Sequence, residues 1–278
     1  MIHCLERKLD DLKRLLHEMG PTLIAFSGGV DSSFLLAIAA DVLGDEVTAL
    51  MTVSSSTPPE DVRQATALVT ALQVRLLTIP HDELAIPAYA ANPSNRCYFC
   101  KHSLYEICRS YAERLSLPSI ADGVNTDDLT DYRPGLQAAT EYGVRHPLVE
   151  AAFDKEAIRQ GSKLLGLPTW KKPASPCLSS RVPYGTPITA RMLSQIAQGE
   201  AFLRSLGLEE FRVRHHGHSA RVEVHPNEFP KISSSAVLRQ IRNQLKGIGF
   251  SSTLLDLEGY RSGVFNSTID GARSEQTA

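Results

Sequence analysis

Short apolar runs alternate with amphipathic segments through the first half of the chain. The apolar runs predict buried strands at 22–26, 46–53, 74–79 and 118–122. The amphipathic segments predict helices at 3–19, 32–43, 58–72 and 101–116. Strands that alternate with helices in this way are typical of a parallel sheet with helices on both faces. This half of the sequence therefore predicts an α/β fold.

A second pattern follows a stretch rich in proline and glycine, at residues 166–187. The order beyond it is helix, strand, strand, helix and strand, expected at 189–206, 211–215, 221–225, 234–246 and 248–257. Such an order in a short segment predicts a small α+β unit. We expect a first domain over 1–185, a second domain over 186–262 and a disordered tail over 263–278.

Composition narrows the class of protein. The chain has 278 residues, of which 42% are hydrophobic and 22% charged, as in ordinary soluble proteins. No apolar stretch approaches the roughly 20 residues of a membrane helix, and the first residues lack the apolar core of a signal peptide. We therefore expect a cytoplasmic protein without membrane contact. A net charge of −2 argues against a protein dominated by nucleic-acid binding.

The most informative motif joins the first predicted strand to the next helix and reads Ser27-Gly28-Gly29-Val30-Asp31-Ser32-Ser33. Two glycines allow a sharp turn, and the amides at a helix N-terminus attract anions. The motif differs from a Walker A loop, because no lysine occurs between Arg14 and Arg63. We therefore expect the loop amides and hydroxyls to carry a bound phosphate. An ordinary glycine-containing turn is the alternative.

Three of the five cysteines are candidates for metal or redox chemistry. Cys97 and Cys100 form a Cys-x-x-Cys pair, which we expect in a loop that leads into a helix, and Cys177 follows a proline at the domain boundary. An arginine and hydroxyls after Cys177 would favour its thiolate. Three thiolates can hold a [4Fe–4S] cluster with one iron open, whereas structural zinc normally takes four protein ligands.

Other interpretations of these cysteines stay open. His102 or His146 could complete a zinc site, Cys97 and Cys100 could be a redox pair, or all three cysteines could serve packing alone. The two remaining cysteines, Cys4 and Cys108, have no partner at a useful spacing. We expect both to be small buried apolar residues.

Polar segments follow three of the predicted strands: the glycine loop, Thr52–Thr57 and Asp122–Asp128. Ligands bind at the carboxyl ends of strands in parallel sheets, so these segments are expected to converge on one site. Asp127 and Asp128 could hold Mg²⁺ or cap the following turn. Arg133 could contact phosphate or lie at the start of a helix that begins with the next proline.

Two arginines alternate on a predicted strand of the second domain. Arg212 and Arg214 would face the same way, and paired guanidiniums suit a nucleotide phosphate. The alternative is an ordinary solvated strand face.

Several segments together resemble the LarE-type family of ATP-dependent sulfur transferases. The segments are Ser27–Ser33, Cys97–Tyr105, Asp122–Asp128, Asp131–Gly135, Gly143–Leu148, Lys172–Gly185 and Phe211–His216. The first of them marks only the wider superfamily of N-type ATP pyrophosphatases, or PP-loop proteins. The segments around Cys177 and Arg212 are more specific. The resemblance implies an adenine nucleotide α-hydrolase-like domain with a smaller C-terminal α+β domain.

The resemblance also implies a reaction. Members of the family use ATP to adenylate a carboxylate of pyridinium-3,5-biscarboxylic acid mononucleotide, and a sulfur nucleophile then displaces AMP. The product leads to the nickel-pincer nucleotide of lactate racemase. In members with a single cysteine at the position of Cys177, that cysteine gives up its own sulfur. Cys97 and Cys100 depart from this pattern and resemble a subgroup with a three-cysteine [4Fe–4S] cluster, whose extra sulfide would be the donor.

Residue roles and partners follow from the same resemblance. The loop from Ser27 to Ser33 would grip pyrophosphate, with Asp31 at Mg²⁺. Arg212 and Arg214 would bind the substrate phosphate near Glu200. Further candidates in or near the matching segments are Lys101, Asn125, Asp127, Asp128, Arg133 and Arg181. The expected partners are a small nucleotide, sulfide or another sulfur donor, and further copies of the chain, assembled through its C-terminal region.

Other functions remain as alternatives. A tRNA thiolase would also combine this loop with a three-cysteine cluster, but it should carry a strongly basic face, and residues 185–261 have only a mild excess of Lys and Arg. Amide synthesis, as in NAD or GMP synthetases, has no need of three cysteines. A non-enzymatic metal-binding module would not need the phosphate loop.

Overall fold

The computed structural model describes residues 2–130, 133–173 and 175–260 and divides the chain into two compact units. Unit 1 comprises the residues up to Glu83 together with Asn95–Ser175, and unit 2 comprises Leu84–Ser94 together with the residues from Pro176 onward. The sequence had led us to expect the first domain to end at residue 185. The expected tail over 263–278, like Asp131 of one matching segment, lies outside the described residues.

Unit 1 is built on a four-stranded sheet in which every neighbouring pair of strands is parallel. In spatial order the strands are β3 (Arg75–Pro80), β2 (Val47–Val53), β1 (Thr22–Ala25) and β4 (Ser119–Asp122). The chain therefore adds β2 and β3 on one side of β1 and then returns to add β4 on the other side. Such a reversal of strand order is where parallel sheets bind ligands, beyond the carboxyl ends of the strands.

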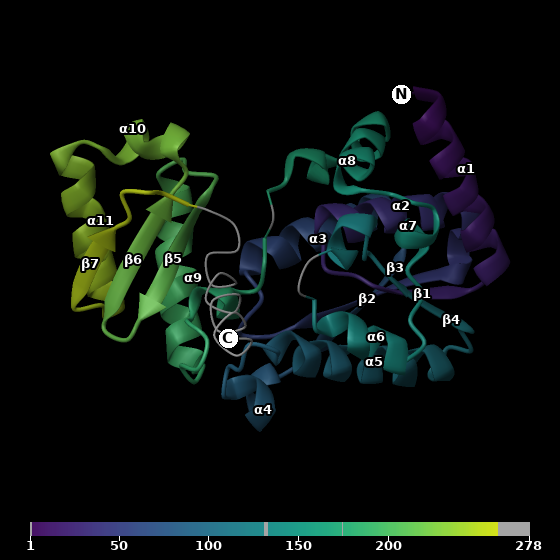
Figure 1. Ribbon diagram of the computed structural model, residues 1–278, viewed down its shortest axis with the longest axis horizontal. Coiled ribbons are helices and arrows are strands. Elements are labelled where there is room, and N and C mark those ends of the chain that lie inside the picture. Colours follow the sequence, from purple (N-terminus) through teal and green to yellow (C-terminus); the bar gives the residue numbers. More distant parts are fainter. Residues whose placement is uncertain (1, 131–132, 174, 261–278) are drawn as a thin grey trace, which may run out of the picture. The chain divides into compact units, whose positions relative to one another are not determined.

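Helices cover both faces of this sheet (Figure 1). Alternate residues of a strand point to opposite faces, so Ile24 and Ala49 pack into a core with α1, α2 and α8, while Leu23 and Leu50 pack with α5 and α6. The helices of unit 1 are α1 (Ile2–Met19), α2 (Val30–Leu43), α3 (Pro59–Ala71), α5 (Arg96–Arg114), α6 (Gly135–Glu141), α7 (Pro147–Glu150) and α8 (Lys155–Leu164). The parallel sheet between helical layers confirms the predicted α/β class.

The greatest local difference from expectation concerns α5. This helix begins at Arg96 rather than at residue 101, so Cys97 and Cys100 lie in its first turns and not in a preceding loop. No proline or glycine follows Pro93 before the helix, and nothing in the local chain delays its start. Of the three helices after β4, α6 follows the proline at which a helix start had been considered, whereas α7 and α8 were not expected.

Unit 2 contains a three-stranded sheet with the order β5 (Phe211–His216), β6 (Ser219–Val224) and β7 (Ser252–Leu255). β5 and β6 form an antiparallel hairpin, and β7 runs parallel to β6. Phe211, Val213 and Val222 share a core with α9 (Ala190–Ser205) and α11 (Ser235–Ile248). Two short helices, α4 (Pro87–Ala90) and α10 (Phe229–Ile232), complete the unit. The order confirms the predicted small α+β unit, and the two short helices α4 and α10 were not expected from the sequence.

Within the described ranges, no helix combines the length and the apolar character that crossing a membrane requires.

The substitution Phe153→Ala tests the packing of the core in unit 1. The Phe153 side chain is fully buried, and its ring lies 5.2 Å from that of Phe34 on α2. We expect Phe153→Ala to lower the free energy of unfolding by about 3–5 kcal/mol, because it removes buried surface and leaves a cavity. Trp170, the only tryptophan, belongs to unit 1, so its fluorescence during urea unfolding reports on this unit.

Leu164→Ala is the matched control, since this side chain at the end of α8 is 74% exposed. Its effect should stay within about 0.5 kcal/mol. A similar loss of stability in both variants would contradict the assignment of Phe153 to the core.

Candidate functional site

The loop from Ser27 to Ser33 connects the carboxyl end of β1 to the N-terminus of α2. Gly28 has φ +70°, and a Cβ added there would lie 2.7 Å from the Cβ of Ala65 on α3. Gly29 is the N-cap residue of α2, without a capping side chain. The first amides of α2 have no partner within the helix, and the helix dipole adds positive potential. The loop therefore offers backbone donors to an anion, as the sequence predicted.

Hydroxyl groups inside the loop fix its shape. Ser27 Oγ lies 3.1 Å from Ser32 Oγ and accepts a hydrogen bond from the Gly29 amide at 3.3 Å. Ser32 Oγ also lies 3.3 Å from the Gly29 carbonyl, to which it can donate. Ser33 is buried, and its Oγ has no hydrogen-bond partner in the described chain. The loop is thus preorganised by its own side chains.

Two lysines that sequence reasoning missed lie at this loop. Lys155 Nζ, at the start of α8, donates to Asp31 Oδ1 at 2.6 Å. Lys172 Nζ donates to the Gly28 carbonyl at 3.1 Å and pairs with Asp61 at 3.0 Å. These two lysines lie at the loop in addition to the amides and hydroxyls that were expected to carry a phosphate. No local pattern could reveal these lysines, because they follow the loop by more than 120 positions.

The end of β4 lies against the start of α2. A Cβ added at Gly123 would lie 2.7 Å from the backbone nitrogen of Ser32 and 2.9 Å from its Cα. The strand order also places β1 between β2 and β4. The three polar segments named from the sequence therefore follow neighbouring strands, at one edge of the sheet.

The candidates after β4 mostly cap a turn. Asn125 Oδ1 accepts from the Asp127 amide at 3.0 Å, and Asp128 Oδ2 accepts from the Asn125 amide at 3.2 Å. Asp127 Oδ2 accepts from the Lys155 amide at 3.0 Å, and Arg133 pairs with Asp128 at 2.7 Å. Both aspartates thus have contacts that cap a turn or a helix start.

Asp31 is the carboxylate best placed for Mg²⁺. The ion usually takes one or two protein carboxylates together with phosphate oxygens, and Asp31 lies in the first turn of α2, beside the anion-binding amides. Its partner in the structure is Lys155. The described residues contain no group of three or more His, Cys, Asp or Glu side chains arranged to hold a metal by themselves.

Cys97 and Cys100 are neighbours on α5, one helical turn apart. Cys97 is exposed and Cys100 is half-buried, and Cys100 Sγ donates to Glu83 Oε1 at 3.0 Å. The other oxygen of this buried carboxylate accepts from Ser54 at 3.0 Å and from Ser56 at 2.5 Å. Lys101, also on α5, lies with its Nζ 5.4 Å from the centre of the Tyr105 ring.

The five cysteines form no disulfide with one another. Cys108 is fully buried, and burial raises the pKa of its thiol to about 12, as suits an inert apolar position. Cys4 is exposed, so the expectation of a buried residue there was wrong. It precedes Leu5, which together with Leu12 and Leu16 forms the buried face of α1.

Cys177 belongs to unit 2 and is held by its neighbour Arg181. Arg181 Nη1 donates to the carbonyls of Pro176 at 2.7 Å and Cys177 at 3.2 Å. Its other two nitrogens form a double ion pair with Glu200 on α9, at 2.8 and 3.0 Å. Burial opposes the charge of Arg181, but Glu200 and the nearby Cys177 outweigh it and raise the guanidinium pKa. The cysteine loop is therefore fixed by a buried ion pair.

Arg212 and Arg214 are both buried, contrary to a solvated strand face. Arg214 pairs with Glu223 of β6 at 2.9 Å and donates to the Ser180 carbonyl at 2.9 Å, so β5 contacts the loop after Cys177. The Arg212 guanidinium lies 4.5 Å from the centre of the Tyr260 ring. Burial and the charges of Arg181 and Arg214 lower the pKa of Arg212.

Several buried charges gather around this loop. The guanidiniums of Arg181, Arg212 and Arg214 lie near the carboxylates of Glu200 and Glu223. Guanidinium groups are donors that suit a phosphate group.

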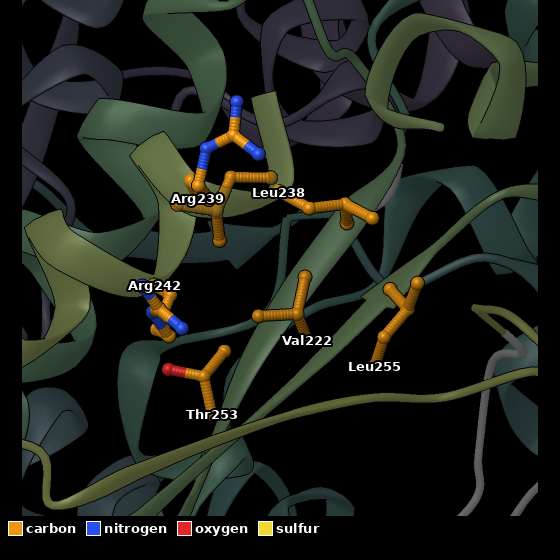
Figure 2. Close-up of a pocket in the computed structure, with 7 residues that line it drawn as sticks. Val222, Leu238, Arg239, Arg242, Thr253 and Leu255 are labelled. Carbon is orange, nitrogen blue, oxygen red and sulfur yellow. The ribbon is translucent and has the colours of Figure 1, made fainter. Parts of the chain in front are cut away.

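A groove of about 250 Å³ in unit 2 is lined by Val222, Leu238, Ile241 and Leu255, with Arg239 and Arg242 beside them (Figure 2). Val222 and Leu255 are paired in register and belong to the helix-covered face of the sheet. Arg212 and Arg214 occupy the alternate positions of β5, on the opposite face. The groove is thus separate from the arginine cluster.

Comparisons with known proteins show which family the chain resembles along its length. Residues 5–95, which contain the phosphate loop, match the NAD synthase family. A pyridinium-3,5-bisthiocarboxylic acid mononucleotide synthase from Lactiplantibacillus plantarum is 36% identical over 97% of both chains. The chain belongs to the LarE family. The NAD synthase match and this membership identify an ATP-using enzyme with a PP-loop domain.

Two further relatives have no described activity. An uncharacterised protein of Synechocystis is 43% identical over 95% of this chain and 99% of its own length. An uncharacterised protein of Methanocaldococcus jannaschii is 29% identical over 92% of this chain and 98% of its own. The similarity to these two proteins thus extends through both units.

Gly123 tests the contact between β4 and the phosphate loop. We expect Gly123→Ala to displace the start of α2, because the new methyl group would meet backbone atoms of Ser32. ATP affinity, measured by calorimetry, should fall about tenfold for a strain near 1.4 kcal/mol. Gly247→Ala on α11 is the control, since nothing lies within 4 Å of the added Cβ. Unchanged ATP affinity in Gly123→Ala would refute the contact's role.

A second prediction concerns the ion pair between Arg181 and Glu200. Arg181→Leu leaves Glu200 buried without its cation and should destabilise unit 2 by about 3–5 kcal/mol. The double variant Arg181→Leu/Glu200→Leu should recover part of this loss, because neither charge is then left alone. Hydrogen exchange of the α9 amides measures the effect within unit 2. If the double variant were less stable than the single one, the pair would not be the source of the loss.

Proposed function

We propose that this protein is an ATP-dependent sulfur transferase that acts on pyridinium-3,5-biscarboxylic acid mononucleotide. It would replace a carboxylate oxygen by sulfur, in the synthesis of the nickel-pincer nucleotide used by lactate racemase. The observation that carries the proposal is the 36% identity, over 97% of the chain, to an enzyme named for the bisthiocarboxylic product. The match includes both the phosphate loop and the segment around Cys177.

The first step is adenylation of the substrate. A carboxylate oxygen attacks the α-phosphorus of ATP, a new oxygen–phosphorus bond forms, and the bond to the β-phosphate breaks with its electron pair leaving on pyrophosphate. The amides at the start of α2 would hold the pyrophosphate, with Lys155 and Lys172 supplying positive charge at the same loop. Asp31 would help hold Mg²⁺, which neutralises phosphate charge.

The second step is displacement of AMP. A sulfur nucleophile adds to the acyl carbon of the acyl-adenylate, and the carbon–oxygen bond to AMP breaks, leaving a thiocarboxylate. We place Cys177 at this step. Arg181 fixes the backbone on both sides of the cysteine, which suits a residue whose sulfur must be presented in one position.

Two sulfur sources are compatible with the residues. Cys177 could give up its own sulfur, or Cys97, Cys100 and Cys177 could hold a [4Fe–4S] cluster. Thiolates are the ligands that such clusters use, and the spacing of Cys97 and Cys100 along α5 places them on neighbouring positions of one helix. A three-cysteine cluster would leave one iron free to carry the transferred sulfide. We propose the cluster, because the chain has the second and third cysteines that a sacrificial mechanism does not need.

The remaining parts of the proposal concern the substrate and the assembly. The guanidiniums of Arg212 and Arg214, on one face of β5, would bind the phosphate of the mononucleotide. A homo-oligomer would form through unit 2, where Leu254 and Leu257 are 54% and 86% exposed. We also propose that the enzyme works in the cytoplasm, where thiols stay reduced.

Anaerobic purification and mass spectrometry test the sulfur source. We expect an iron–sulfur absorbance that is lost in each of Cys97→Ala, Cys100→Ala and Cys177→Ala. After reaction with ATP and the pyridinium dicarboxylate, we expect AMP, pyrophosphate and a thiocarboxylate product, with Cys177 unchanged in mass. Cys108→Ala is the control, since this buried thiol should not affect the absorbance.

Different outcomes separate the parts of the proposal. Loss of one H₂S from Cys177 after a single turnover would replace the cluster by sacrificial chemistry. A colourless protein with bound zinc would also overturn the cluster. Failure to form AMP with this substrate, together with tight RNA binding that weakens steeply with salt, would sink the small-nucleotide function itself.

A further inference from the structure

A buried carboxylate lies at the carboxyl end of β4, next to the phosphate loop. Asp122 is 2% exposed and uses both oxygens. Its Oδ2 accepts from the Tyr105 hydroxyl of α5 at 2.5 Å. Its Oδ1 lies 2.7 Å from Nδ1 of His146 and accepts from the Val124 amide at 3.1 Å. The proposed adenylation step has so far used no residue of this Tyr–Asp–His group.

Backbone pairing fixes His146 beside the strand. Arg145 forms a parallel bridge with Ala121, in which its amide donates to the Ile120 carbonyl at 2.9 Å and its carbonyl accepts from the Asp122 amide at 3.2 Å. His146 is the next residue and the N-cap of α7. Its ring is therefore held by the sheet edge and not by a loose loop.

The charges around His146 favour the imidazolium form. Burial opposes that charge, but the hydrogen bond and the charge of Asp122 outweigh it, and the pKa of His146 is raised. Glu150 on α7 acts in the same direction, and Lys101 on α5 acts against it. Burial and the charge of Asp122 raise the pKa of Tyr105, so this phenol keeps its proton and remains a donor. The pKa of Asp122 is lowered despite its burial, chiefly by the hydrogen bond from His146.

The geometry leaves one ring nitrogen for a ligand. Since Nδ1 faces Asp122, Nε2 lies on the far side of the ring from the carboxylate. The His146 side chain is 21% exposed, so the ring is not sealed in the core. An Asp that orients an imidazole and stabilises its charge is a recurrent arrangement where the second nitrogen meets a reactant.

The neighbouring contacts relate this group to ATP. Gly123, directly after Asp122, packs against the backbone of Ser32 in the phosphate loop. β4 is also paired with β1, whose end leads into that loop. A buried ion pair is a costly way to fasten a strand end, because apolar packing would serve as well. The charge is better explained by an anionic ligand.

We propose that His146 is a phosphate-contacting residue of the ATP site, in which Nε2–H donates to an oxygen of the phosphate chain. Asp122 is then its positioning residue. This inference deepens the proposed function and rests only on its adenylation step. During that step negative charge moves along the phosphate oxygens, where an oriented cationic donor stabilises it.

ATP binding across pH tests the proposal, using calorimetry on the full chain from about pH 6 to pH 9. The imidazolium is present below the raised pKa of His146 and is lost as pH rises through it, so wild-type affinity should weaken on the alkaline side. His146→Gln should bind ATP about tenfold more weakly at the acidic end and lack this alkaline loss. Asp122→Asn should move the loss to lower pH. His17→Gln, on the exposed end of α1, is the matched control and should behave like the wild type.

A second measurement needs no variant. Diethyl pyrocarbonate modifies accessible imidazoles, and peptide mass spectrometry gives the rate at each histidine. ATP should slow modification of His146 in the wild-type protein and leave that of His17 unchanged. Equal rates at His146 with and without ATP would overturn the proposal, as would a His146→Gln variant with the wild-type affinity and pH profile.

The results also separate this inference from the proposed function. If the wild-type protein forms the thiocarboxylate but His146→Gln binds ATP as the wild type does, only the role proposed for His146 is contradicted. A histidine-dependent pH profile for ATP, without AMP formation from the pyridinium dicarboxylate, would remove only the sulfur-transfer function.

Discussion

The close approach of β4 to the start of α2 is the contact on which the nucleotide site depends. Gly123 has no side chain, and its backbone therefore meets that of Ser32, where any Cβ would collide. This contact places the end of β4 against the phosphate loop. Because β1 lies between β2 and β4, the amide donors of α2 and the polar turns after both neighbouring strands share one edge. The phosphate loop is thus surrounded by the ends of strands that are distant from it in sequence.

Buried charge plays different parts in the two units. In unit 2, Arg181 joins Glu200 to the backbone around Cys177, and Arg214 reaches the same loop from β5. These contacts hold the cysteine segment in place. In unit 1, the carboxylates of Asp122 and Glu83 are each held by several donors at the edge of the sheet. Both arrangements place costly groups where packing alone would not require them, which is typical of functional sites.

Family membership and the contacts in the structure give different kinds of information about this protein. Identity over nearly the whole chain assigns the LarE family, whereas the structure gives particular side chains their contacts. Arg212 and Arg214 illustrate the difference. The sequence predicted that they alternate on one strand. Their burial and the contact of Arg214 with the Cys177 loop depend on how β5, β6 and the loop pack. The same holds for Asp127 and Asp128, whose capping contacts could not be chosen over a metal site from their positions alone.

The sequence by itself determined the strands, most helices, the phosphate loop and the cysteines of interest, because these depend on local hydrophobic period, glycine positions and residue chemistry. It misplaced the start of α5, although Asn95 stands at the N-cap position directly before Arg96. Only the tertiary structure decided which distant groups meet. Lys155 reaches Asp31 across 124 positions, and His146 reaches Asp122 across 24. Strand order and helix packing bring such pairs together. The hydrophobic periodicity of the sequence does not predict them.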